Sequence, residues 1–164
     1  MHPACLPPSD LAKQCKELRT RRGGPGGQHR NKVETAVVLL HGPTGISAEA
    51  SERRSQAENR QVALNRLRLK LALEHRTPAP VEVSEAWRRR VRGRQLVISV
   101  GHADYPTLVA EALDRLQETN GQVSWAAEKL GVSTTQLIGL LRKSPAAWVA
   151  VNRHRTAAGR PPLK

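Results

Sequence analysis

The residues with the clearest capacity for chemistry are Gly26, Gly27 and Gln28, inside the loop sequence GGPGGQHRNK. Two adjacent glycines adopt backbone angles that are closed to other residues, and they let the chain approach another molecule with no Cβ in the way. A peptide N–H presented there, at Gln28, is a neutral, preorganised donor that can stabilise the charge developing on an ester carbonyl under attack. The Gln28 side-chain amide can also hold a water molecule or screen the site. We therefore predict that Gln28 is catalytic and that the two glycines shape the loop.

Glycine-rich loops beside basic residues also bind the phosphates of nucleotides, so a nucleotide site is the main alternative. A P-loop requires GxxxxGK[ST], which the residues from Gly23 to Lys32 do not satisfy. A dinucleotide fingerprint requires GxGxxG between a strand and a helix, whereas here the spacing differs and a strand-like sequence follows. Cys5 and Cys15 form no CxxC pair, and the histidines show no metal-binding spacing. We therefore expect no cofactor and no metal.

The chain of 164 residues is strongly basic, with 27 Lys and Arg against 14 Asp and Glu and a formal net charge of +13. The cations are spread over both halves, which favours a polyanionic partner, nucleic acid before a membrane surface; a basic protein with no such partner is the simpler alternative. Three Trp, one Tyr and no Phe argue against base stacking and favour recognition of phosphate and shape. The candidate RNA-binding residues are Arg19, Arg21, Arg22, Arg30, Lys32, Arg54, Arg88, Arg89 and Arg90.

The sequence carries no recognisable targeting signal. Its start, MHPACLPPSD, lacks a basic region followed by an apolar one, and no apolar run approaches the length of a membrane span. We expect a cytoplasmic protein with reduced thiols and no membrane partner.

Two strand-like sequences flank the Gln28 loop and would hold it. KELRTR precedes it, and the Val- and Leu-rich sequence Glu34–His41 follows it. Gly42–Gly45 predicts a turn, Ile46–Ala50 a returning strand, and Ser55 to about Glu74 a long helix with leucines on one face. The expected fold class is α+β, a small mixed sheet with one long covering helix.

The second half of the sequence indicates helices after a proline-containing break. RTPAPVEV, Arg76 to Val83, excludes a helix and predicts a linker. Helical spacing begins near Pro106, and a helix, a Gly-containing turn and a second helix within Gln122–Lys143 have the helix-turn-helix pattern. The expected organisation is an N-terminal segment with a short helix (1–15), a catalytic domain (16–75), a basic linker (76–104), an all-α helix-turn-helix-like module (105–156) and a basic tail (157–164).

The sequence around the loop resembles the catalytic GGQ domain of class I peptide chain release factors. The resemblance runs from about residue 16 to 74, and a lone GGQ tripeptide would be weak evidence without the sequence that follows it. The shared positions are Gly24, Gly26, Gly27, Gln28, His29, Asn31, Lys32, Thr35, Ala36, Val37, His41, Pro43, Thr44, Gly45, Ile46, Glu52, Arg54, Ser55, Gln56, Asn59, Ala63, Leu64 and Leu67.

The resemblance implies hydrolysis of the ester between a nascent peptide and tRNA in the peptidyl-transferase centre of the large ribosomal subunit. The backbone N–H of Gln28 would act on the developing charge, and its side chain would exclude nucleophiles other than water. The family's glutamine is commonly N5-methylated, which implies a glutamine methyltransferase acting on Gln28. The expected partners are large-subunit rRNA and peptidyl-tRNA, bound by a monomer. Arg30 and Pro25 depart from the small residues common at those two positions.

From the length of the chain we expect it to lack the domain that reads the stop codon in full-length termination factors. The chain is similar to the short, codon-independent members that rescue stalled ribosomes, although those usually end in a disordered basic tail and this second half has a folded pattern. Two alternatives stay open: a non-catalytic RNA- or DNA-binding helix-turn-helix protein, and a ribosome-associated factor whose GGQ is inactive. The would-be recognition helix, Ser133–Leu141, offers mostly Thr, Gln and Leu, which is poor for reading bases.

Overall fold

The computed structural model describes residues 1–20 and 35–164, and in the strand before the gap the side chains of residues 19 and 20 are not described. The chain divides into two compact units. One comprises Leu6–Leu71, and the other combines Met1–Cys5 with Ala72–Lys164.

The Leu6–Leu71 unit is built on a three-stranded sheet of order β1-β2-β3. A short helix, α1 (Pro8–Lys13), leads into β1 (Cys15–Thr20), and β2 (Ala36–His41) and β3 (Ser47–Ala50) follow. Both strand pairs are antiparallel. The expectation of a small sheet is confirmed, but the expectation that it is mixed is wrong. The turn between β2 and β3 is too short for a parallel crossover, which needs about a dozen residues or more.

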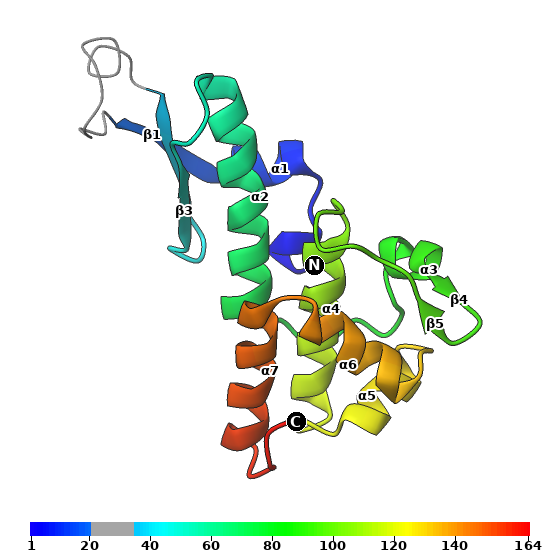
Figure 1. Cartoon of the computed structure of the whole chain (residues 1–164). Coiled ribbons are helices and arrows are strands. Elements are labelled where there is room, and N and C mark those ends of the chain that lie inside the picture. Colours follow the sequence, from blue (N-terminus) through cyan, green and yellow to red (C-terminus); the bar gives the residue numbers. More distant parts are fainter. Residues whose placement is uncertain (21–34) are drawn as a thin grey trace. The chain divides into compact units, whose positions relative to one another are not determined.

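One long helix, α2 (Gln56–Glu74), runs beside this sheet (Figure 1). Its residues Leu64, Leu67 and Leu71 recur at helical spacing, and all three are buried. Arg66 Nη1 donates to the Glu49 carbonyl oxygen at 2.8 Å, and Lys70 Nζ donates to an oxygen of β3 at the same distance. The helix therefore lies along β3, as the sequence pattern predicts for a covering helix.

The other unit is centred on α4 (Tyr105–Glu118), in which every residue from Tyr105 to Leu116 is buried. The short η1 (Pro3–Cys5) and several helices pack against it. Figure 1 shows α7 beside α4, and α3 with its hairpin at the edge of this unit. The remaining elements are α3 (Glu85–Arg90), β4 (Val91–Arg92), β5 (Gln95–Leu96), α5 (Val123–Lys129), α6 (Thr134–Arg142) and α7 (Pro145–Ala157).

Residues 76–104 differ from the predicted linker, because they hold α3 and the β4–β5 hairpin and belong to this compact unit. The extended start of the segment is bound by Asp114, which is 2% exposed. Asp114 accepts hydrogen bonds from Arg76 Nη1 at 2.8 Å, Thr77 Oγ1 at 2.7 Å and Thr77 N at 3.2 Å. Burial lowers the pKa of the Arg76 guanidinium, and the charge of Asp114 opposes that shift.

Two more charged residues of α4 hold the rest of this extended segment. Glu111 accepts from Ser84 N at 2.7 Å and Ser84 Oγ at 2.6 Å, and Arg115 Nη2 donates to the Pro80 carbonyl oxygen at 2.5 Å. Burial raises the pKa of Glu111, while the bonds from Ser84 lower it. Ser84 also caps α3, because its Oγ accepts from Trp87 N at 3.1 Å. The extended segment 76–84 is therefore a strap held on α4.

The residues after α7 fold back along that helix. Leu163 N donates to Asn152 Oδ1 at 2.7 Å, and Arg155 Nε donates to the Pro161 carbonyl oxygen at 3.0 Å. Arg142 Nη2 donates to the Lys164 carbonyl oxygen at 2.5 Å. The stretch predicted as a basic tail is thus hydrogen-bonded to the helical unit. In the part of the chain that the structure describes, no helix has the length and apolar character needed to cross a bilayer.

Candidate functional site

The predicted catalytic residues stand between β1 and β2. Gly26, Gly27 and Gln28 lie outside the described residues, and so do the predicted RNA contacts Arg21, Arg22, Arg30 and Lys32. Arg19 lies in β1 paired with Val37, but its side chain is not described.

The sheet holds both ends of the Gln28 segment together. Thr20 is the last residue of β1, Ala36 is the first residue of β2, and the two are direct partners in the antiparallel register. Direct partners of this kind have Cα atoms about 4.5–5.5 Å apart. The segment that carries Gln28 therefore leaves and re-enters the sheet at one point, where the ladder of β1 and β2 ends.

Asn59 in α2 fixes the residue at which the segment re-enters. Its side chain is fully buried, and Nδ2 donates to the Thr35 carbonyl oxygen at 2.6 Å and to the Arg53 carbonyl oxygen at 3.0 Å. Its Oδ1 accepts from Arg53 N at 2.9 Å. One amide thus joins the backbone just after the Gln28 segment to the turn that precedes α2. In the sequence Asn59 is one of the positions shared with release factors, but it is not among the predicted site residues.

A sequence signal for Asn59 does exist. Asn59, Ala63, Leu67 and Leu71 are spaced four apart in α2, and all four are fully buried. A polar side chain in such an apolar stripe must find hydrogen-bond partners inside the protein, because burying an unpaired amide is costly.

His41 holds the turn at the other end of β2. The ring is fully buried, with Nδ1 at 2.7 Å from Thr44 Oγ1 and Nε2 at 3.0 Å from Gln14 Oε1. Thr44 Oγ1 accepts from Ile46 N at 3.3 Å, so its proton is available to the ring. These contacts give His41 a structural role. Among the described residues, no three His, Cys, Asp or Glu side chains gather as metal ligands would.

The predicted RNA contacts on α3 separate into two kinds. Arg88 and Arg89 have side chains 57% and 60% exposed, and they reach Glu82 and Glu85 at 3.3 Å and 3.5 Å. Arg90 is 29% exposed and donates to Asp104 Oδ2 from Nε at 3.0 Å and from Nη2 at 2.9 Å.

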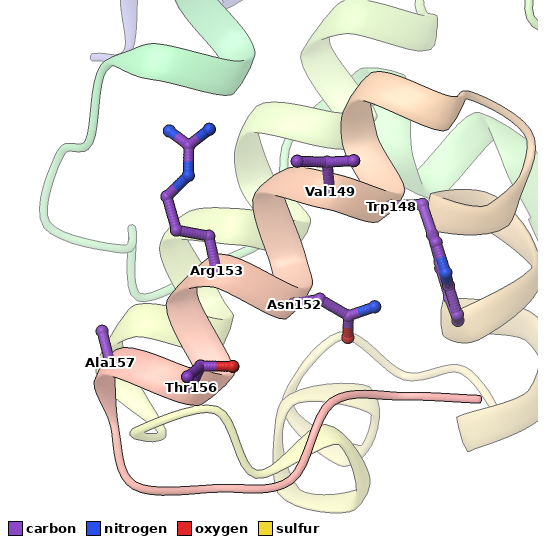
Figure 2. Close-up of a pocket in the computed structure, with 6 residues that line it drawn as sticks. All are labelled: Trp148, Val149, Asn152, Arg153, Thr156 and Ala157. Atoms are coloured by element: carbon purple, nitrogen blue, oxygen red, sulfur yellow. The ribbon is translucent and has the colours of Figure 1, made fainter.

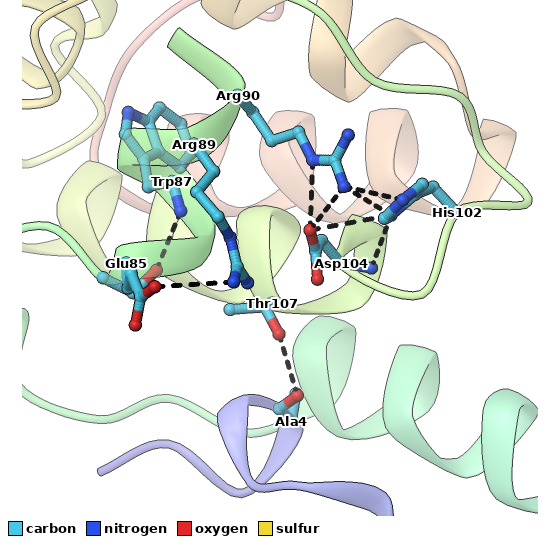
Figure 3. Close-up of polar contacts among 9 residues, drawn as sticks. Ala4, Glu85, Trp87, Arg89, Arg90, His102, Asp104 and Thr107 are labelled. Atoms are coloured by element: carbon cyan, nitrogen blue, oxygen red, sulfur yellow. Dashed lines mark hydrogen bonds and ion pairs between the residues drawn. The ribbon is translucent and has the colours of Figure 1, made fainter.

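Figure 3 shows Arg90 directed to Asp104 and the His102 ring, whose Nε2 lies 2.6 Å from Arg90 Nη2. Arg90 therefore has an internal structural role, whereas Arg88 and Arg89 face solvent. Arg54, in the turn before α2, is also exposed.

The β4–β5 hairpin is hydrogen-bonded to the start of α6, although Thr134 and Thr135 in the first turn of that helix are exposed. Ser133 caps the helix by accepting from Gln136 N at 3.3 Å. The Gln136 Oε1 atom accepts from Leu96 N at 3.0 Å, Ser133 N donates to the Arg94 carbonyl oxygen at 3.1 Å, and Trp87 Nε1 donates to the Leu130 carbonyl oxygen at 2.8 Å. The N-terminal end of α6 is thus bonded to the β4–β5 hairpin, and α3 is bonded to the C-terminal end of α5.

One face of α7 carries an open hollow of about 630 Å³. Figure 2 shows its lining residues, Trp148, Val149, Asn152, Arg153, Thr156 and Ala157, along that helix. None of the predicted site residues lines it.

Comparison with known protein families finds a match to the family described as "RF-1 domain" over residues 10–102, more than half of the chain. The chain belongs to the class I peptide chain release factor family. The match in this release-factor-family chain extends from α1 through the β4–β5 hairpin, and α4 to α7 come after it.

Curated release factors match the same part of the chain. "Peptide chain release factor PrfB1, chloroplastic" of Arabidopsis thaliana is 47% identical over 66 residues, 40% of this chain and 14% of that protein. "Peptide chain release factor 1" of Chloroherpeton thalassium is 41% identical over 93 residues, 56% of this chain and 24% of that protein. "Peptide chain release factor 1-like, mitochondrial" of Mus musculus is 43% identical over 68 residues, 42% of this chain and 17% of that protein. This chain thus spans less than a quarter of these relatives.

Proposed function

We propose that this chain hydrolyses the ester that joins a nascent peptide to tRNA, on the ribosome and without reading a stop codon. The observation that carries the proposal is the GGQ tripeptide in a segment bracketed by the partners Thr20 and Ala36, inside a chain that matches the RF-1 domain family. Relatives named as peptide chain release factors support the same role.

In the proposed reaction, water attacks the ester carbonyl carbon. The bond to the ribose oxygen of tRNA breaks, the ribose oxygen takes up a proton, and the peptide leaves with a free carboxyl group. Gln28 N–H donates to the carbonyl oxygen as negative charge develops on it, and the Gln28 side chain excludes competing nucleophiles. No strong base is needed where the substrate is an activated ester held in position.

The partners in this proposal are large-subunit rRNA and peptidyl-tRNA, bound by a monomer. The exposed arginines and the net charge of +13 support an RNA partner. A glutamine methyltransferase would act on Gln28. We propose a cytoplasmic location, although two of the relatives carry the words chloroplastic and mitochondrial in their names.

Peptide release from purified ribosomes tests the proposal. The ribosomes hold a labelled peptidyl-tRNA in the P site and no codon in the A site, and released peptide is counted over time. We expect wild-type protein to release peptide. Release that requires a stop codon would contradict the codon-independent reading, and no release at any protein concentration would contradict the hydrolase.

Two variants of Gln28 then test the mechanism. Gln28→Pro removes the backbone N–H, and the loss of one oxyanion donor lowers a rate by about 10²- to 10³-fold. Gln28→Ala keeps the N–H and loses only the side chain, so its rate should fall less. Equal losses in the two variants would refute the backbone donor.

A further inference from the structure

We propose that α3 and the β4–β5 hairpin form a docking surface for the phosphate backbone of double-stranded RNA. This arginine platform consists of Arg88, Arg89, Arg92 and Arg94, all of which are exposed. The choice of RNA over other polyanions rests on the proposed function. The platform differs from the predicted RNA contacts Arg88, Arg89 and Arg90, because it excludes Arg90 and adds Arg92 and Arg94 of the hairpin.

The hairpin turn places its two arginines at an open tip. Arg92 ends β4, and Gly93 and Arg94 connect it to β5. Gly93 has a φ of +59°, and an added Cβ there would meet no atom within 4 Å. A glycine with positive φ at the first position is typical of a two-residue hairpin turn. Arg94 Nη2 donates to the Val132 carbonyl oxygen at 3.3 Å, which uses only part of its guanidinium.

The internal bonds of the unit make the platform rigid. Trp87, on the buried side of α3, is 1% exposed and donates from Nε1 to the Leu130 carbonyl oxygen. Val97 N donates to the Arg90 carbonyl oxygen at 3.0 Å, and Leu96 N donates to Gln136 Oε1. A backbone that is already ordered loses little conformational freedom when a partner binds.

The arginines of α3 are available to a partner despite their ion pairs. Arg88 and Arg89 pair with Glu82 and Glu85 at long distances, and those carboxylates are 81% and 76% exposed. Exposed pairs of this kind contribute little to stability. Phosphates can therefore replace the two carboxylates at low cost. Arg90 cannot be recruited in this way, because Asp104 and His102 hold it inside.

Contact with phosphates fits this surface better than reading of bases. In a helix-turn-helix protein the N-terminal residues of the second helix contact base edges. Here Gln136 of α6 is bonded to Leu96 N, and Ser133 N is bonded to the Arg94 carbonyl oxygen. Two groups at this end of α6 are therefore already engaged by the β4–β5 hairpin, and its exposed residues Thr134 and Thr135 carry no charge. Binding should therefore be independent of sequence and strongly dependent on salt.

The salt dependence of binding to a mixed-sequence RNA duplex of about 20 base pairs tests the platform. The variant Arg88→Gln/Arg89→Gln/Arg92→Gln/Arg94→Gln is compared with Lys13→Gln/Lys16→Gln/Lys143→Gln/Arg153→Gln, which loses the same charge at exposed sites elsewhere. Each phosphate contact contributes about 0.9 to the slope of log K against log salt. We expect the platform variant to lose about three units of slope and the control variant less than about one.

The change of slope in the platform variant, compared with that in the control variant, decides whether the platform binds RNA. Equal changes of slope in the two variants, or no change in either, would overturn the platform. A DNA duplex of the same sequence is the second arm: loss on RNA, with or without loss on DNA, supports the proposal, and loss on DNA alone overturns the assignment to RNA. Thermal unfolding of both variants shows whether they are folded.

The experiment contains no ribosome and no peptidyl-tRNA, so its result is separate from the hydrolase. Loss of slope in a protein that releases no peptide would leave the platform standing and the hydrolase refuted. Unchanged slope in a protein that does release peptide would refute the platform alone.

Discussion

The side chain of Asn59 makes hydrogen bonds to two segments at once, Thr35 after the Gln28 segment and Arg53 before α2. Its amide is fully buried, and both of its polar atoms have partners. The contribution of this residue is therefore positional: it sets where the backbone enters β2 after the proposed catalytic segment.

Replacement of Asn59 by Ala removes all three of these bonds and leaves backbone groups without partners. We expect the free energy of unfolding to fall by about 1–3 kcal/mol, measured by urea denaturation. Gln61→Ala is the matched control, since Gln61 is an exposed amide in the same helix, and its effect should stay within about 0.5 kcal/mol. A similar loss in the two variants would show that the Asn59 bonds do not stabilise the fold.

At the scale of elements, the strap over residues 76–84 depends on carboxylates of α4. Asp114 holds Arg76 and Thr77, and Glu111 holds Ser84. The strap also sets the start of α3, because Ser84 caps that helix. The arginine platform is therefore tied to α4 through a buried carboxylate.

Asp114→Asn should weaken this arrangement strongly. The amide nitrogen cannot accept from Thr77 Oγ1 as Oδ2 does, and the neutral amide leaves a largely buried guanidinium without a counter-charge. We expect a loss of about 2–4 kcal/mol in the free energy of unfolding, below the full range for buried pairs because Arg76 is partly exposed. Glu82→Gln, which changes an exposed pair, is the control and should have little effect. Equal stability of Asp114→Asn and wild type would contradict the strap.

The sequence predicted most elements but not this strap. The prolines of RTPAPVEV correctly excluded a helix, but nothing in them shows whether an extended chain is bound or free. The bond-forming partners, Glu111 and Asp114, lie in a helix whose leucine spacing suggests that charged positions face water. Only the packing of distant segments buries them. The mixed sheet was wrong for a different reason, because the short predicted turn Gly42–Gly45 already requires antiparallel pairing of β2 and β3.

At the candidate site, too, the sequence predicts residue types but not which side chains are held by internal contacts. Residue types alone predict that Gln28 and its glycines are catalytic, and this stays a prediction because these residues lie outside the described ones. Residue types could not separate Arg90, which pairs with Asp104, from Arg89, which faces solvent, because both stand in one cationic run.

At the scale of the whole molecule, the first five residues belong to the unit formed by residues 72–164. Thr107 Oγ1 donates to the Ala4 carbonyl oxygen at 3.2 Å, a contact drawn in Figure 3. His2 is 5% exposed, its Nδ1 accepts from Ala4 N at 3.0 Å, and its Nε2 lies 3.1 Å from the His75 carbonyl oxygen. Neutral His2 is therefore part of this unit's core.

His2 should make the stability of this unit depend on pH. Burial lowers the pKa of His2; the bond to His75 and the charge of Asp114 oppose the shift, and Arg76 and the His75 ring add to it. The pKa of His2 is lower in the folded state than in the unfolded state. The contribution of neutral His2 to the free energy of unfolding is therefore complete above about pH 6.5. It is lost as the pH falls from there through the folded pKa.

The measurement is the free energy of unfolding of wild type and His2→Asn from pH 7.5 to 5. Asn keeps an acceptor for Ala4 N but does not titrate. Wild type should lose more stability on acidification, by at most about 1.4 kcal/mol per pH unit. Parallel curves for the two proteins would refute the role of His2.

The membership of Met1–Cys5 in the later unit has a consequence for synthesis on the ribosome. These residues are made before their partner Thr107, which follows about a hundred positions later in the sequence. All residues of the Leu6–Leu71 unit are translated before Thr107, so this unit can fold earlier. Until α4 has been translated, residues 1–5 cannot form their contacts with it. Closing so long a loop is slow, so docking of the first five residues is expected to be a late step in folding.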